Sequence, residues 1–256
     1  MSRSALTGAD GFCVFGFDAR VAAWAQAAGH AARAVARDPA WRVTDNLRHG
    51  GTWFVGVDAL PNAPDGSIAG VPLRGPWQTR VPDLPLHRAQ LSIIYPRYPQ
   101  QDAGQSAANH RFRRDRAGAH VDGLLPVGPA RRRFAREYHA YILSLPLGDV
   151  TAAPTVVWRG SQQIMQPALR AAIGSRDPAQ TDITEAYTAA RAQVFAQCEA
   201  VPLVLTRGQS ALLHPFVLHG TLPWGTAPDP ADGEGRMIVF FRPDSAAGAA
   251  GWLATQ

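Results

Sequence analysis

Short apolar segments separated by turns that contain glycine or proline are the feature that most restricts the fold of this chain. The segments span four to nine residues and are rich in β-branched and aromatic side chains, as strands are. Helical patterns do not alternate with them as in βαβ folds. We therefore expect a mainly β protein with flanking helices (α+β), a cupin-like double-stranded β-helix or jelly roll. The expected strands are 12–15, 52–57, 89–95, 139–145, 154–158, 201–206, 211–219 and 236–242.

Two helical regions accompany this β pattern. Apolar residues at helical spacing run from Asp18, the expected N-cap, to about Arg37. A later helix is expected to begin at the capping-box pair Asp182 and Glu185. Because no repeat or linker divides the chain, one domain is the expected organisation. That jelly-roll domain would cover 1–256, with an N-terminal helical region at about 1–50 and a helical insertion at about 161–200.

The composition argues against a nucleic-acid partner. Basic residues exceed acidic ones by 25 to 20, and every base is an arginine. Eight arginines gather between 111 and 136, but no interleaved aromatic stacking platform accompanies them. Guanidinium groups bind carboxylates and phosphates, so an anionic small-molecule substrate or cosubstrate is one interpretation. A solvated basic rim is the favoured one, because runs of charge usually form such surfaces. The eight are Arg111, Arg113, Arg114, Arg116, Arg131, Arg132, Arg133 and Arg136.

Membrane and disulfide-rich classes are also disfavoured. No apolar run approaches the ~18 residues of a membrane span. The N-terminal residues lack the charged and apolar regions of a secretory signal, so we expect a cytoplasmic protein with no membrane partner. Cys13 and Cys198 are too few for a disulfide framework or a cysteine zinc site and are expected to be small buried residues. The sequence leaves the oligomeric state open.

The segment 118–123, Gly-Ala-His-Val-Asp-Gly, carries the first sign of a metal site. Side chains alternate along an extended strand, so His120 and Asp122 would point the same way. This pattern alone arises by chance in roughly every second chain of such composition. A non-haem iron(II) site also needs a second imidazole. His214 and His219 are the candidates, and because they lie an odd number of residues apart, a regular strand would present only one of them.

The expected strand 89–95 carries a polar pair, Gln90 and Ser92, on one face. If that face borders the lumen of the barrel, the pair can hydrogen-bond a polar ligand. If it is the outer face, the two side chains are merely solvated. Alternation along the strand does not decide between these interpretations.

In order and spacing, these motifs resemble the phytanoyl-CoA dioxygenase-like branch of the Fe(II)/2-oxoglutarate-dependent dioxygenases, over about 90–242. That branch places H-x-D after an early core strand, then a turn similar to P-G-S-H, then a segment similar to G-D-x-x-x-F-H-x-x-x-x-H-G, and finally an arginine that opens the last strand. The matching stretches are His120-Val121-Asp122, Arg159-Gly160-Ser161-Gln162, Gly208-Gln209 through His214 to His219-Gly220, and Gly235-Arg236 to Phe240. Gln162 departs from the family's histidine, and the connection 224–234 is longer than is usual in the family.

The resemblance implies that His120, Asp122 and His219 form the catalytic metal centre. His214 would then belong to the inner strand or support a ligand without binding the metal. The carboxylate also bears on the reaction, because halogenating relatives carry a small residue in its place. Asp122 therefore favours hydroxylation.

The resemblance also implies a pocket for 2-oxoglutarate. Arg236 would pair with the C5 carboxylate, while the C1 carboxylate and the keto oxygen chelate the iron. Gln90 and Ser92 are the other candidates for binding this cosubstrate. Arg242 is the rival of Arg236, since an even separation lets both face the lumen.

The activity implied is that of an iron(II)- and 2-oxoglutarate-dependent oxygenase. With O2, it would hydroxylate an unactivated C–H bond of a small molecule or acyl conjugate and convert 2-oxoglutarate to succinate and CO2. One alternative is a metal-binding cupin-like jelly roll with a non-oxidative activity, and the other is a noncatalytic ligand-binding jelly roll. Neither alternative requires 2-oxoglutarate.

Overall fold

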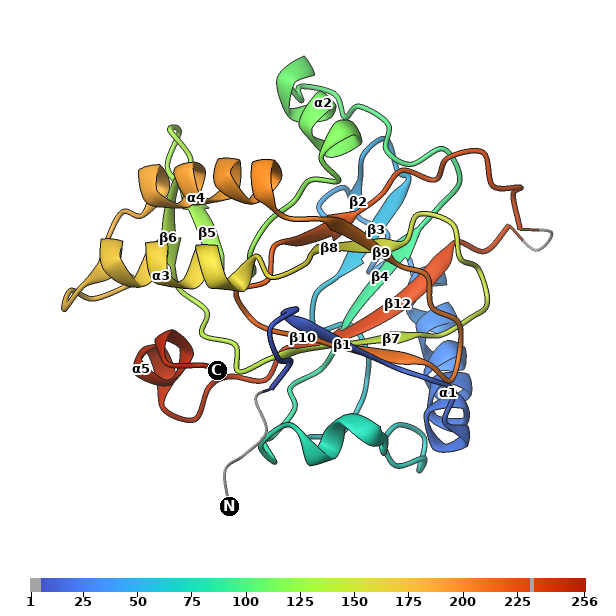
Figure 1. The fold of residues 1–256 in the computed structure, drawn as a ribbon. Helices are drawn as coiled ribbons and strands as arrows, with labels where there is room; N and C mark the ends of the chain where they lie inside the picture. Colours follow the sequence, from blue (N-terminus) through green and yellow to red (C-terminus); the bar gives the residue numbers. More distant parts are fainter. Residues whose placement is uncertain (1–5, 231–232) are drawn as a thin grey trace.

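Antiparallel pairing of the short apolar segments builds two sheets in the computed structural model, which describes residues 6–230 and 233–256 (Figure 1). The larger sheet has seven strands in the order β1-β10-β7-β12-β4-β3-β2, and the smaller has three in the order β11-β8-β9. A separate hairpin pairs β5 with β6. The strands are β1 (Phe12–Phe15), β2 (Leu47–Arg48), β3 (Trp53–Gly56), β4 (Gln90–Ile94), β5 (Leu124–Val127), β6 (Arg132–Ala135), β7 (Ile142–Pro146), β8 (Thr155–Trp158), β9 (Ala200–Leu203), β10 (Ser210–Leu213), β11 (His219–Thr221) and β12 (Arg236–Phe241).

Eight chain segments divide between the two sheets as in a double-stranded β-helix. Four of them, β4, β12, β7 and β10, are neighbours in the larger sheet. The smaller sheet holds β8, β9 and β11, and a single bridge from His120 to His219 adds a fourth segment beside β11. This connectivity confirms the expected mainly β, jelly-roll fold.

Helices lie on both sides of this core (Figure 1). Helix α1 starts after Asp18, whose side chain accepts a hydrogen bond from the backbone N–H of Arg20 at 2.8 Å, as an N-cap does. In the insertion, α3 and α4 pack against each other, and α4 also contacts β6. The helices are α1 (Ala19–Arg37), α2 (Ala107–Asp115), α3 (Gln162–Ile173), α4 (Thr184–Gln197), α5 (Gly248–Leu253) and the 3₁₀-helix η1 (Pro76–Thr79).

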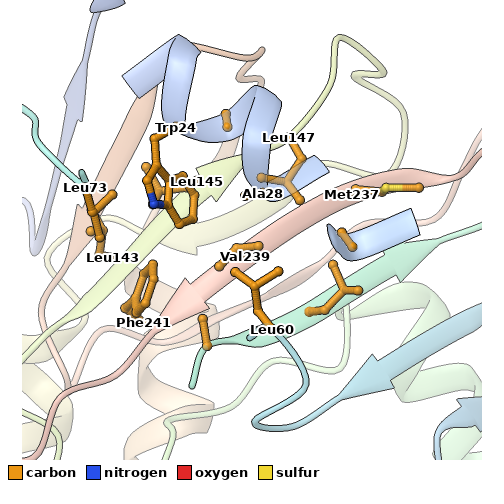
Figure 2. Packing of buried hydrophobic residues seen from close by; sticks show 14 of the residues in the cluster. Trp24, Ala28, Leu60, Leu73, Leu143, Leu145, Leu147, Met237, Val239 and Phe241 are labelled. Carbon is orange, nitrogen blue, oxygen red and sulfur yellow. The ribbon is translucent and has the colours of Figure 1, made fainter. Parts of the chain in front are cut away.

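The main hydrophobic core lies between α1 and the outer face of the larger sheet. Figure 2 shows Trp24 of α1 beside Leu145 of β7 and Phe241 of β12. The Trp24 and Phe241 ring centroids are 5.7 Å apart, and the indole N–H donates to the Gly66 carbonyl at 2.8 Å. The 61–86 loop thus packs onto this outer face, and its Trp77 belongs to the same core.

The outer core decides which way the polar pair of β4 points. Leu91 and Ile93 of β4 and Val239 of β12 all belong to the cluster under α1. Side chains alternate along a strand, so Gln90 and Ser92 face the interior between the two sheets. The interpretation in which they are solvated on an outer face is therefore excluded.

The expected strand 211–219 is two strands in different sheets. β10 ends at Leu213 in the larger sheet, and β11 begins at His219 in the smaller one. The connection turns at Pro215, and the N–H of Val217 donates to the carbonyl of His214 at 2.9 Å. The parity argument for the two histidines therefore does not apply, although the conclusion that only one of them reaches the other candidate ligands holds.

Three local expectations also differ from the structure. The H-x-D segment is not a regular strand, because only His120 bridges to a neighbour before the chain turns into the β5–β6 hairpin. The stretch 99–109 before it, whose polar composition predicts a loop, runs into α2, which Ser106 caps by accepting from Asn109 N–H at 3.2 Å. No capping box forms at Asp182 and Glu185; instead Arg132 of β6 pairs with both carboxylates.

Candidate metal centre

The centre is built on a backbone pair between two distant segments. His120 and His219 exchange hydrogen bonds, with N–H to carbonyl distances of 2.8 and 3.0 Å. Residues paired in this way project their side chains to the same side of the sheet. The two imidazole centroids accordingly lie 4.7 Å apart.

Gly220 allows the two segments to approach this closely. A Cβ at this position would lie 2.4 Å from the carbonyl oxygen of Ala117, closer than any side chain tolerates. The N–H of Thr221 also donates to that carbonyl at 3.0 Å. The His-Gly pair of the motif therefore has a packing reason, since any larger residue would push the His219 strand away from His120.

Asp122 completes the cluster from the turn that follows His120. One carboxylate oxygen, Oδ1, lies 3.1 Å from His120 Nε2, and the other, Oδ2, lies 3.5 Å from His219 Nε2. The ligand atoms of the three residues all lie within 4.8 Å of one another. Within residues 6–230 and 233–256, these are the only histidine, cysteine and acidic side chains grouped in this way.

Hydrogen bonds orient both imidazoles toward a common point. His120 Nδ1 lies 3.0 Å from the Gly118 carbonyl, and His219 Nδ1 lies 3.0 Å from the Val217 carbonyl. A carbonyl only accepts, so each Nδ1 carries the proton and donates it. Each Nε2 is then left with its lone pair toward Asp122, which is the orientation that metal-binding histidines adopt.

Electrostatics favour the protonation states of His120 and Asp122 that a metal requires. Burial lowers the pKa of His120 and outweighs the hydrogen bond that a protonated ring would donate to Asp122, so the imidazole is neutral at neutral pH. Burial opposes ionisation of Asp122, but the Arg242 guanidinium and the two imidazoles outweigh it and hold the carboxyl pKa well below its ordinary value. Two neutral imidazoles and one carboxylate are the donors of non-haem iron(II) sites, so the residues fit that ion.

Arg242 and Gln90 lie against the carboxylate. Arg242 Nε donates to Asp122 Oδ2 at 2.5 Å, and its Nη1 donates to Gln90 Oε1 at 2.7 Å. The guanidinium also lies over the Phe240 ring at 5.2 Å. The structure thus places Gln90 in the interior, in contact with Arg242.

Arg236 lies at the opposite end of β12 and is a buried cation. Its side chain is only 5% exposed, and its Nε has no hydrogen-bond partner among the described residues. Burial lowers its pKa to about 10, which still leaves it charged at neutral pH, and the Tyr98 hydroxyl is close enough to act on it. No carboxylate within residues 6–230 and 233–256 forms an ion pair with it. A buried guanidinium without a counter-ion is suited to a carboxylate ligand.

An aromatic group adjoins Ser92, and its Tyr98 is close enough to Arg236 to act on that charge. Ser92 Oγ accepts from the indole N–H of Trp53 at 2.9 Å, so Ser92 is turned toward this group. Trp53 stacks on His49 with centroids 5.6 Å apart, and Tyr98 meets both rings edge-on. Arg113 of α2 lies over Trp53 at 5.2 Å, with Nη1 3.4 Å from the Tyr98 hydroxyl.

Arg113 also lies under the backbone of the H-x-D segment. A Cβ added to Gly118 would lie 2.2 Å from the guanidinium carbon of Arg113. Its charge contributes to lowering the pKa of His120, after burial and the neighbouring imidazole. Among the described carboxylates none forms an ion pair with Arg113, unlike Arg132 in the same basic stretch, which pairs with Asp182 and Glu185.

The remaining candidates lie elsewhere. His214 is buried and its Nδ1 accepts from the Phe216 N–H at 3.2 Å, so it supports the β10–β11 connection. The amide of Gln162, at the position where the family has histidine, donates to the carbonyl of Ala9 at 3.0 Å and fastens the N-terminal segment. The connection 224–234 falls partly outside the described residues, although its Trp224 packs beside Tyr98.

Sequence reasoning did not single out Trp53, Tyr98 or Arg113. Arg113 was one of eight clustered arginines, and only the fold of α2 separates it from its neighbours on the surface. Trp53 lies in the expected strand 52–57, and its pairing with Ile94 of β4 puts it on the face that Gln90 and Ser92 share. Tyr98 follows β4 in a Pro-containing loop and carries no pattern that indicates a site.

A cavity of about 750 Å³ lies under the 61–86 loop, against Tyr141 on the outer face of the larger sheet. The metal candidates lie on the inner side of that sheet. Burial raises the pKa of Tyr141 to about 12, so its hydroxyl is neutral. The cavity is therefore separate from the centre.

The fold of this chain is similar to several solved structures, at low sequence identity. No family model matches the chain, and no curated protein matches it. Separately, no helix in the described residues has the length and apolarity to cross a membrane. EctD from S. alaskensis in its apoform is similar, with 15% identity over 97% of this chain and 83% of that chain and a TM-score of 0.48. The carbocyclase SnoK from nogalamycin biosynthesis, described as non-heme and alpha-ketoglutarate dependent, has 12% identity over 93% and 81%, with a TM-score of 0.47. AviO1 from Streptomyces viridochromogenes has 15% identity over 93% and 91%, with a TM-score of 0.42.

Proposed function

We propose that this protein is an iron(II)- and 2-oxoglutarate-dependent oxygenase of the phytanoyl-CoA dioxygenase-like type that hydroxylates a C–H bond. One observation carries the proposal: a two-histidine, one-carboxylate cluster shares an interior with Arg236, a buried guanidinium whose Nε is unpartnered among the described residues. The cluster accounts for the metal, and the guanidinium accounts for a carboxylate-bearing cosubstrate.

Each residue has a defined part in this proposal. His120, Asp122 and His219 would hold the iron through two Nε2 atoms and a carboxylate oxygen. Arg236 would bind the C5 carboxylate of 2-oxoglutarate in a planar, bidentate manner that lysine cannot reproduce. Bound iron and 2-oxoglutarate supply the oxidation, in which the cosubstrate becomes succinate and CO2 and one oxygen atom of O2 enters the substrate. Because Asp122 provides the carboxylate that halogenating relatives lack, hydroxylation is the proposed outcome.

The protein itself contributes an enclosed and charged setting. Arg236 and Tyr98 are both nearly fully buried, at 5% and 2% exposure, so water does not compete strongly for a bound carboxylate. The rings of Trp53 and Tyr98 pack edge-on, and Ser92 holds the Trp53 indole by its N–H, so these rings would form apolar walls of the pocket. Gln90 would act through Arg242 and Ser92 through Trp53, rather than by contacting the cosubstrate.

The proposed substrate is a small molecule or acyl conjugate with an anionic group. Arg113 supports this part of the proposal, because it lies beside His120 and over the Trp53 ring without a carboxylate partner among the described residues. Once Arg236 has bound the cosubstrate, Arg113 is the remaining cation of this group that has no carboxylate partner among the described residues. A carboxylate or phosphate on the substrate would pair with it and place the substrate next to the iron.

The decisive experiment is 2-oxoglutarate binding by the iron-loaded protein. Purified protein is incubated anaerobically with Fe(II) and titrated with 2-oxoglutarate by calorimetry, and in air with ascorbate it is assayed for succinate formed without substrate. Binding that requires both iron and the C5 carboxylate, tested with 2-oxobutyrate as the matched monocarboxylate, is the expected result. A cupin-like isomerase, a hydrolase or a noncatalytic jelly roll predicts no 2-oxoglutarate binding, and that result would defeat the proposal.

A further inference from the structure

The carboxylate of Asp122 is shared between the imidazoles and a guanidinium. Arg242 Nε donates to Oδ2 at 2.5 Å, whereas Oδ1 faces His120 Nε2 at 3.1 Å. The side chains of Asp122 and Arg242 are 11% and 16% exposed, so the pair is largely shielded from water. Oδ2, which also lies 3.5 Å from His219 Nε2, is thus engaged by the arginine, and Oδ1 is left beside His120.

Arg242 is itself held in place at two further points. Its Nη1 donates to Gln90 Oε1 at 2.7 Å, and its backbone carbonyl lies 2.9 Å from His87 Nε2. The guanidinium also rests over Phe240 at 5.2 Å. A long side chain fixed in this way loses little further freedom when it orients a neighbour, so the contact with Asp122 is preorganised.

We propose that Arg242 is a positioning residue that restricts Asp122 to one metal-binding oxygen, with Gln90 as its brace. The inference rests on the proposed function, since it concerns the same metal centre. A carboxylate that binds through both oxygens occupies two coordination positions. The two-histidine, one-carboxylate arrangement works because three positions stay open, two for the cosubstrate and one for O2. Reserving Oδ2 for Arg242 keeps that third position free.

The same contact separates the roles of the two arginines of the last strand. Arg242 has a carboxylate partner in the protein, whereas Arg236 has none among the described residues. Removing Arg242 from Asp122 to bind a cosubstrate would leave a buried carboxylate unpaired, which is strongly unfavourable. Arg242 is therefore assigned to the ligand Asp122 and not to 2-oxoglutarate.

The Asp122–Arg242 ion pair also affects the net charge of the metal centre. The Asp122–Arg242 pair is neutral as a unit, so an iron(II) ion held by two neutral imidazoles and this pair keeps its double positive charge. A centre of that charge attracts a dianion such as 2-oxoglutarate more strongly than the single positive charge that an unpaired carboxylate would leave. Arg242 thereby favours the cosubstrate without touching it.

The test uses Co(II), whose visible absorption reports coordination number, as a probe of the metal site in the whole protein. The variants are Arg242→Ala, Arg242→Lys and Gln90→Ala, with Arg20→Ala as the matched control because Arg20 pairs with Asp18 on the surface at 63% side-chain exposure. We expect Arg242→Ala to weaken Co(II) binding about 10- to 100-fold, the usual effect of losing a hydrogen bond to a metal ligand, and to change the band positions and intensities.

The other variants give a graded series. Arg242→Lys keeps a charge and one donor, so it should restore part of the affinity; Gln90→Ala should cause a smaller loss in the same direction. Added ethylguanidine should return the Arg242→Ala spectrum toward that of the wild type, which a purely structural role would not produce. If Arg242→Ala does not fold, Arg242→Lys and Gln90→Ala carry the same comparison.

Failure of this inference is distinguishable from failure of the proposed function. Wild-type protein that binds no Co(II) or Fe(II) would defeat the proposed function. Wild-type binding together with unchanged affinity and spectrum in Arg242→Ala would overturn the positioning role of Arg242 alone. A spectrum that changes equally in Arg20→Ala would also overturn it, because the effect would then not be local.

Discussion

His120 and His219 lie 99 positions apart in the chain, yet each donates its backbone N–H to the carbonyl of the other, and their rings are 4.7 Å apart. The pairing forms the edge of the smaller sheet, so the metal centre and the closure of the barrel depend on the same contact. A change that separates the two segments should therefore affect metal binding before it affects the distant core under α1.

Gly220→Ala tests this dependence. The new methyl group would lie 2.4 Å from the Ala117 carbonyl, so the His219 segment must move away from His120. Overpacking of this kind costs about 1–3 kcal/mol of stability. We expect weaker Co(II) binding and a lower Tm. Gly148→Ala is the control, because a Cβ there meets nothing within 4 Å. Unchanged metal affinity in Gly220→Ala would show that the close approach is not needed.

The two histidines of the β10–β11 region should behave differently when each is changed to alanine. His219→Ala removes a ligand and should abolish tight metal binding, as His120→Ala and Asp122→Ala should. His214→Ala leaves the ligands in place and should retain metal affinity, although loss of its hydrogen bond with Phe216 costs about 1 kcal/mol of stability. Metal titration and urea unfolding separate the two effects. Loss of metal binding in a folded His214→Ala protein would contradict the assignment.

Arg236→Ala should weaken 2-oxoglutarate binding to the metal-loaded protein about 10- to 100-fold, the loss expected for charge-assisted hydrogen bonds of about 1.5–3 kcal/mol. Metal affinity should not change, because Arg236 contacts none of the three ligands. Arg236→Lys should recover only part of the binding, since lysine lacks the planar fork. Calorimetry with 2-oxoglutarate and with 2-oxobutyrate measures the effect, and equal losses for both ligands would argue against a contact with the C5 carboxylate.

Stability should rise with pH between about 4 and 6.5, for a reason that does not involve the metal. Burial lowers the pKa of both His49 and His214 from 6.5 to about 4. The unfolded chain then binds more protons in this window, so the free energy of unfolding increases with pH and reaches its full value above about 6.5. At about 1.4 kcal/mol per pKa unit, each imidazole contributes on the order of 3 kcal/mol.

His214→Asn isolates one of these contributions. Asparagine can still accept the Phe216 N–H but does not titrate. Urea unfolding at pH 5 and pH 7 should therefore show a smaller difference in the variant than in the wild type, with His30→Asn on the exposed face of α1 as the control. Equal pH differences in the three proteins would mean that His214 is not a buried neutral imidazole.

Local patterns were sufficient for most elements of the fold. The period of apolar residues predicted α1, and Asp18 caps it as expected because an N-cap depends only on its own turn. Strands β4, β7, β8 and β12 follow from apolar runs of the right length. The break between Leu213 and His219 escaped prediction, because a continuous apolar run does not show that it crosses from one sheet to the other. The capping box failed because Arg132, 50 positions before Asp182, offers both acidic side chains a cation instead.

The sequence by itself determined which residues could act: His120, Asp122 and His219 as metal ligands, and Arg236 and Arg242 as cations on the last strand. Alternation places both arginines on one face, so only the family resemblance favours Arg236 for the cosubstrate. The tertiary structure distinguishes them by contacts, because it brings Asp122 within 2.5 Å of Arg242 and leaves Arg236 Nε buried without a partner among the described residues. Local patterns specify which face a side chain occupies and where an element ends. The choice between the two arginines depends instead on the contact of Arg242 with Asp122, 120 positions away in the chain.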